Sequence, residues 1–241
     1  MRMMTFAKRN IKEILREPLG IILGLGFPIV MLILLSVLNK SIPTPVSMFD
    51  INVLTPGIAV FSFTFTTLFA GLLIAQDRAS SFLTRLYSSP MKSGDFILGY
   101  MLPMLPLTVA QSMICFAAAM FFGYELGINT LWSVLLLIPS GVFYVALGVL
   151  MGSVFSDKVV GGVGSIVINL ATLSAGVWFP LEDMKGTAFY KVCTNMPFYH
   201  TVNVGRGGDI GKSLIWVIAS SVVMTVIAAA VFKYKMSSDN K

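Results

Sequence analysis

The stretch Ile51–Gln76, INVLTPGIAVFSFTFTTLFAGLLIAQ, decides the class of the protein because it contains no Asp, Glu, Lys or Arg. It is longer than the roughly 20 residues that a helix needs to cross the hydrocarbon core of a bilayer. Five more stretches lack these charged residues and contain at least 20 residues, so each can hold one spanning helix. They are Leu19–Asn39, Phe96–Tyr124, Leu126–Ser156, Val159–Leu181 and Ser213–Phe232.

The composition of the whole chain excludes a soluble domain. Of the 241 residues, 56% are hydrophobic and 12% are charged, and the mean hydropathy is +0.85. A soluble domain carries about 25% charged residues. We therefore predict an all-α integral membrane protein, residues 1–241 as one domain, with six transmembrane helices. Their expected cores are residues 20–38, 54–75, 97–122, 131–154, 159–179 and 213–232.

The basic residues predict the orientation of these helices. Twelve of the 17 Lys and Arg residues fall in the N-terminal segment, the second and fourth connecting segments and the C-terminal tail. Short segments rich in Lys and Arg stay in the cytoplasm, so both termini are expected there and the loop 180–212 outside. The net charge of +6 is interpreted in the same way, and not as a sign of nucleic-acid binding.

The segment before the first span has the period of an amphipathic helix. In residues 3–17, apolar side chains such as Met4, Ile11 and Leu15 share one face, and basic side chains share the other. A basic amphipathic helix beside a membrane lies in the lipid interface. We expect an interfacial helix over 3–17; a short solvated arm is the alternative.

The six span cores contain no Asp, Glu, Lys, Arg or His. Ion-coupled carriers keep such residues in the membrane, and a membrane-embedded enzyme needs an acid, a base or metal ligands. Both classes are therefore less favoured than a transporter whose energy comes from a separate polypeptide. A scaffold that anchors another protein is a further alternative. The run 206–213 resembles a phosphate-binding loop, but Arg206 replaces its first Gly, and a Gly-rich turn is preferred.

The segment 76–92, between spans two and three, is a candidate docking site for that polypeptide. Its pattern predicts a short helix with an apolar face, flanked by charges and ended by a proline. Such a patch suits a protein contact, and a helix lying on the bilayer is an equal alternative. The candidate contact residues are Asp77, Arg78, Phe82, Leu83, Arg85, Leu86 and Pro90.

Three motifs resemble those of the ABC-2 type transporter permeases. The first is Arg78, Arg85-Leu86 and Pro90, although Ser81 stands where the family has Gly. The second is GVWFPLE at 176–182, and the third is PFYH at 197–200 followed by Arg206. Together with six spans and the N-terminal helix, these motifs make the resemblance extend over nearly the whole chain.

The resemblance implies a transport subunit without enzymatic activity, in the cytoplasmic (inner) membrane of a prokaryote. It implies a homo- or heterodimer of permeases, each bound to a cytoplasmic ATP-binding subunit that holds ATP and Mg²⁺. The segment 77–90 would be the coupling helix, and the outer segment 181–212 would fold partly back into the membrane as short helices. No catalytic residue, metal or cofactor is expected in this chain.

Small polar residues on spans two and five are candidates for the substrate pathway, because the resemblance places these spans beside the dimer axis. The candidates are Ser62, Thr66, Ser165, Asn169, Thr172 and Gly176. Helix packing is the preferred explanation for any single one of them. Asn169 is the exception, because an amide in mid-membrane is costly unless paired or hydrated. The flanking Phe61, Phe65 and Phe69 are interpreted as lipid-facing. The pairs Gly20/Gly24 and Gly148/Gly152 predict tight helix crossings.

The weakly polar stripes favour export of a small amphipathic compound, such as a drug, a lipid-like molecule or a peptide. Export of a polysaccharide or glycolipid is the alternative within the same family.

Overall fold

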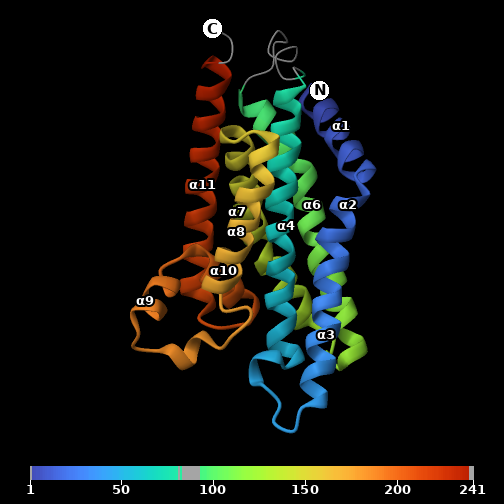
Figure 1. Ribbon diagram of the computed structural model, residues 1–241, viewed down its shortest axis with the longest axis vertical. Coiled ribbons are helices and arrows are strands. Elements are labelled where there is room, and N and C mark those ends of the chain that lie inside the picture. The colour runs from blue at the N-terminus through green and yellow to red at the C-terminus, as the bar shows by residue number, and fades with distance from the viewer. Residues whose placement is uncertain (1, 81, 83–92, 239–241) are drawn as a thin grey trace.

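The computed structural model describes residues 2–80, 82 and 93–238, and every regular element in this part of the chain is helical (Figure 1). The long elements are α1 (Arg2–Arg16), α3 (Phe27–Ser41), α4 (Ile51–Ala79), α6 (Ser93–Ala119), α7 (Ile128–Val154), α8 (Asp157–Ser174) and α11 (Ile210–Ser238). The short ones are α2 (Pro18–Ile21), the π-helical turn η1 (Ile22–Gly26), η2 (Ser47–Phe49), η3 (Met120–Phe122), η4 (Leu181–Met184), α9 (Ala188–Thr194) and α10 (Pro197–Gly205).

Five of the six predicted spans are confirmed as apolar helices of spanning length in the described residues, with mean hydropathies of 1.8 to 2.5. The remaining one, predicted at 159–179, is α8, which has 18 residues and ends at Ser174. Its end has a local cause. Gly176 has φ 61°, and the N–H of Val177 donates to the carbonyl of Thr172 over 3.1 Å, which is the pattern that closes a helix at glycine.

The bundle is built around α4, which contacts α3, α6, α7, α8 and α10. Its crossing with α7 depends on glycine. A Cβ atom at Gly148 would collide with the backbone of Thr67, and one at Gly152 with the backbone of Gly71. The predicted tight crossing at Gly148/Gly152 is therefore confirmed. Gly20 and Gly24 instead lie against the ring of Phe69, so that pair marks a contact with a side chain.

The two ends of the bundle differ in their elements. In Figure 1 both termini lie at the upper end, together with α1 and the end of α4, whereas α9, α10 and the connection between α3 and α4 lie at the lower end. The N- and C-termini thus share one end of the bundle, and the orientation predicted from the basic residues stays a prediction.

The amphipathic helix α1 has two apolar surfaces. Phe6 and Ala7 are buried against the rest of the chain, whereas Met4, Ile11 and Leu15 are exposed. Since α1 packs against α6, the helix is attached to the bundle by one side and presents the other outward.

Candidate functional site

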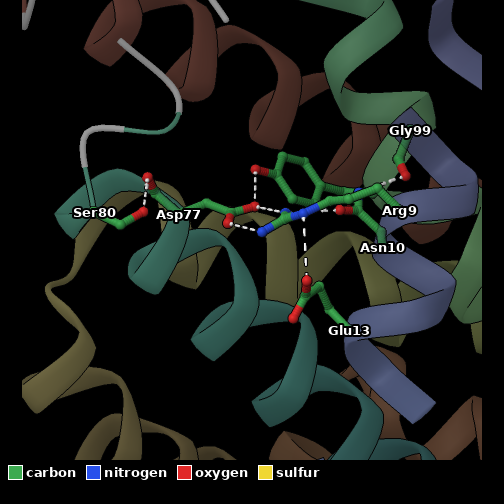
Figure 2. A network of polar contacts seen from close by, with 7 residues as sticks. Arg9, Asn10, Glu13, Asp77, Ser80 and Gly99 are labelled. Atoms are coloured by element: carbon green, nitrogen blue, oxygen red, sulfur yellow. Dashed lines mark hydrogen bonds and ion pairs between the residues drawn. The ribbon is translucent and has the colours of Figure 1, made fainter. Parts of the chain in front are cut away.

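An ion pair joins α1 to α4 at the end of the bundle that carries the termini (Figure 2). Arg9 donates from Nη1 to Oδ2 of Asp77 over 2.5 Å and from Nη2 to Oδ1 over 2.7 Å. The hydroxyl of Tyr100, on α6, donates to the same Oδ2 over 2.8 Å. Asn10 adds a hydrogen bond from Nδ2 to the carbonyl of Gly99 over 3.0 Å. These contacts fasten α1, α4 and α6 to one another.

Asp77 is only 3% exposed. The interpretation of Asp77 as the charged edge of an exposed patch is therefore wrong. Its carboxylate is buried and accepts hydrogen bonds from Arg9 and Tyr100. Bidentate pairing of a guanidinium with a carboxylate is among the strongest polar contacts in proteins. Here it fixes the end of α4, where the segment 76–92 begins.

Phe82 lies against α1. Its ring is stacked on Phe6 at a centroid distance of 6.3 Å, and the Arg9 guanidinium lies 4.3 Å from its centroid. Phe6 in turn packs over Gly99, where a Cβ would collide with the ring. The Phe82 ring thus packs on side chains of α1.

Arg78 caps α7. Its Nη1 donates to the carbonyls of Gly152 and Ser153 over 3.0 and 2.7 Å, which belong to the last turn of that helix. A cation there satisfies carbonyls that have no partner within the helix and interacts favourably with the helix dipole. The remaining candidate contact residues lie outside the described residues: Leu83, Arg85, Leu86 and Pro90.

The candidate pathway residues of α8 line a groove of about 300 Å³ between α3, α4 and α8. Ser165, Asn169 and Thr172 form one wall, and Phe27, Phe61, Phe65 and Trp178 form much of the rest. Asn169 is exposed, and its Nδ2 donates to the carbonyl of Ser165 over 2.8 Å. Its Oδ1 has no hydrogen-bond partner among the described residues, so it remains available to a ligand.

Ser62 and Thr66 do not join this groove. Both are fully buried in a polar contact with α6, where Thr66 donates to Oε1 of Gln111 over 2.8 Å. The Nε2 of Gln111 donates to the carbonyls of Gly24 and Ser62 over 3.0 and 3.3 Å. The two polar stripes predicted to share a pathway thus lie on different sides of α4.

The residues of α4 that line the groove are aromatic: Phe61 and Phe65. Phe61 and Phe65 are 4% and 8% exposed, so their interpretation as lipid-facing is wrong. Phe61 meets Trp178 edge to face at a centroid distance of 5.0 Å. Sequence reasoning gave Gln111 no role, although the signal existed: it is an amide inside an uncharged span, like Asn169.

Arg206 fixes the backbone at Gly176, just beyond the end of α8. Arg206 donates from Nη1 to the carbonyl of Gly176 over 3.0 Å and from Nε to the carbonyl of Val53 over 3.1 Å. No carboxylate in the described ranges forms an ion pair with Arg206, and its burial lowers the pKa of the guanidinium to about 10. The cation therefore stays protonated at neutral pH and connects the ends of α4, α8 and α10.

The segment 180–212 returns toward the middle of the bundle. It forms η4, α9 and α10, and α10 contacts α4, α7 and α11. Phe198 packs on Phe143 and Tyr144 at centroid distances of 5.6 and 6.0 Å. These two rings belong to the middle of α7, so α10 is inserted among the long helices.

The long apolar helices of spanning length indicate a multi-pass membrane protein. The sequence matches the family model described as ABC-2 type transporter over residues 1–210, and the chain belongs to that family as a permease subunit. Permeases of this family normally form dimers and work with an ATP-binding subunit. Among curated proteins no match to the sequence was found.

Proposed function

We propose that this chain is the permease of an exporter that moves an amphipathic compound out of the cytoplasm of a prokaryote. ATP, with Mg²⁺, is hydrolysed by a separate subunit, and two permease protomers form the pathway. The groove beside α8 carries this proposal, because uncharged aromatic walls and one amide with a free oxygen suit a mainly apolar ligand with few polar groups.

The proposed topology has six spans, with α8 as the fifth and both termini in the cytoplasm. Eighteen helical residues extend about 27 Å, close to the roughly 30 Å of the hydrocarbon core. The insertion of α10 beside Tyr144 supports an outer segment that re-enters the membrane from the opposite side.

Single cysteines test this topology in a background without Cys115 and Cys193. Ser156 and Thr187 are exposed and flank α8 at its two ends. We expect an impermeant thiol reagent to label Thr187→Cys in intact cells and Ser156→Cys only after the cells are opened. Labelling of both positions from the same side would show that α8 does not cross the bilayer.

The segment 76–92 is proposed to bind the ATP-binding subunit through Leu83, Arg85 and Leu86, while Asp77, Arg78 and Phe82 position it. Truncating two large apolar contacts costs roughly 1.5–3 kcal/mol each, which is about a hundredfold or more in affinity. In the double variant Leu83→Ala, Leu86→Ala, the ATPase subunit should therefore no longer co-purify with the permease. The purified sample should then show no ATP hydrolysis.

Phe121→Ala is the matched control for this experiment, because Phe121 is 89% exposed and lies in η3, beyond the C-terminal end of α6. Normal retention of the ATPase by the double variant would refute the docking role of this segment. ATP hydrolysis by the permease alone would refute the two-subunit proposal.

Asn169 is proposed to contact the transported compound. Asn169→Leu removes the free amide oxygen, and loss of one hydrogen bond of this kind costs about 1–3 kcal/mol. We expect the assembled complex to need roughly tenfold more compound for the same stimulation of ATP hydrolysis. Ile166→Leu, an exposed position of α8 outside the groove, should change nothing. An unaltered stimulation curve for Asn169→Leu would make Asn169 a packing residue.

A glycolipid is the second candidate substrate. Sugars and other rings stack on aromatic side chains, and Phe27, Phe61, Phe65 and Trp178 gather in the groove. The same stimulation assay, run with a glycolipid and with a cationic drug, separates the two substrates.

A further inference from the structure

A second cavity, of about 290 Å³, lies on the other side of α4. It is enclosed by the junction of α1 and α2, by η1, and by α4 and α6. Its inner wall is apolar and includes Phe69, Leu73, Met104 and Leu107, whereas Glu13, Arg16 and Glu17 stand among its polar lining residues. The cavity thus combines charged and apolar surfaces, and it shares no lining residue with the groove beside α8.

The cavity is lined by both acidic and basic residues, and most of them have no ion-pair partner among the described side chains. Arg16 and Glu17 are exposed, and neither forms an ion pair with another described side chain. Glu13 makes one long contact, 3.8 Å from its Oε1 to Nε of Arg9. Two carboxylates and one guanidinium are therefore available at the level of α1.

The space itself is created by backbone features. The π-helical turn Ile22–Gly26 interrupts the helix that borders the cavity, and such turns are frequent at functional sites. The carbonyl of Gly24 is taken by Gln111, which is fully buried. Gly20 has no side chain there, and a Cβ would meet Phe69 at an ordinary 3.5 Å. A larger residue at position 20 would therefore fill the cavity without displacing the backbone.

We propose that this cavity binds a zwitterionic aminophospholipid of the inner leaflet. The ammonium group pairs with Glu13 and Glu17, the phosphate pairs with Arg16, and the first methylenes of an acyl chain lie along Phe69 and Leu73. This proposal rests on the topology proposed above, which places α1 at the level of the headgroups. Mixed charges at the rim favour a zwitterion over an anionic lipid, and the apolar wall favours a lipid over a soluble ion.

The test is native mass spectrometry of the purified chain with equimolar phosphatidylethanolamine, phosphatidylcholine and phosphatidylglycerol of identical acyl chains. A primary ammonium donates up to three charge-assisted hydrogen bonds, whereas the quaternary ammonium of phosphatidylcholine donates none. We expect the ethanolamine lipid to be retained roughly tenfold better than either of the others. Equal retention of the three lipids, retention of none, or preference for the anionic lipid would overturn the proposal.

Two variants place the lipid in this cavity. Gly20→Leu should abolish the preference by filling the space, and Glu17→Gln should weaken it by removing one charge. Gly26→Leu is the matched control, since it lies in the same helical stretch, and a Cβ there meets only Ile22 at 3.9 Å. A preference that survives in Gly20→Leu would show that the lipid binds elsewhere. The assay uses neither ATP nor a transported compound, so its result is independent of the export proposal.

Discussion

Asp77→Ala is expected to detach α1 from the bundle and to destabilise the purified permease by about 3 kcal/mol. Removing one partner of a buried ion pair costs about 3–5 kcal/mol because the other charge is left without compensation. The lower end of that range applies because the Arg9 side chain is 32% exposed and recovers some hydration. The Tyr100 hydroxyl loses its acceptor in the same variant.

A double-mutant cycle with Arg9→Ala separates this interaction from a general loss of packing. Residues that share an ion pair show non-additive effects, so Arg9→Ala should cost little more once Asp77→Ala is present. Thermal unfolding in detergent measures both, and proteolysis within α1 reports its release. Asp183→Ala, at an exposed carboxylate, is the control. Additive effects of the two substitutions would contradict the clamp between α1 and α4.

The same contact explains how the proposed docking segment could depend on α1. Asp77 and Arg78 are consecutive residues, and they bind α1 and α7 respectively. Phe82, further along the chain, lies under Arg9. A change in the position of α1 or α7 would therefore move the start of the segment 76–92, and with it the proposed contact with the ATP-binding subunit.

The spanning helices could be predicted from sequence because they depend on composition over some twenty residues. Ile128–Val154 and all but the last turn of Ile51–Ala79 follow directly from uncharged runs. The sequence pattern predicts the end of α8 too late, because one left-handed residue, Gly176, stops a helix whose apolar pattern continues to Phe179. Glycine in an apolar run marks either packing or a cap, and the pattern alone does not distinguish them.

The partners of polar residues could not be predicted in this way. The pairing of Arg9 with Asp77 spans 68 positions and depends on where α1 docks. The sequence shows the stripe of Ser62 and Thr66. However, α4 is surrounded by other helices, so the helix that this polar face meets depends on how the helices cross. Small residues allow the helices to approach closely, as Gly148 does where α7 meets the backbone of Thr67.

Replacing Gly148 and Gly152 together by alanine is expected to separate α4 from α7 and to prevent the permease from folding stably. Each added methyl group would collide with the backbone of α4, at Thr67 and at Gly71, and a backbone cannot rotate away as a side chain does. Overpacking costs about 1–3 kcal/mol per site, and it outweighs the gain of about 1 kcal/mol in helix propensity. The hydrogen bond of 2.7 Å from the Thr67 hydroxyl to the Tyr144 carbonyl also crosses this contact.

Gly161→Ala together with Gly162→Ala is the matched control, because both positions lie in α8 and a Cβ at either meets nothing within 4 Å. These substitutions change propensity alone, so the control should unfold at the same temperature as the natural protein or a higher one. In a membrane, lipid competes with helix contacts for apolar surface, and close approach of backbones becomes the main source of specificity. A Gly148→Ala, Gly152→Ala permease as stable as this control would therefore mean that α4 and α7 are held together by their large side chains, and that the glycines are incidental.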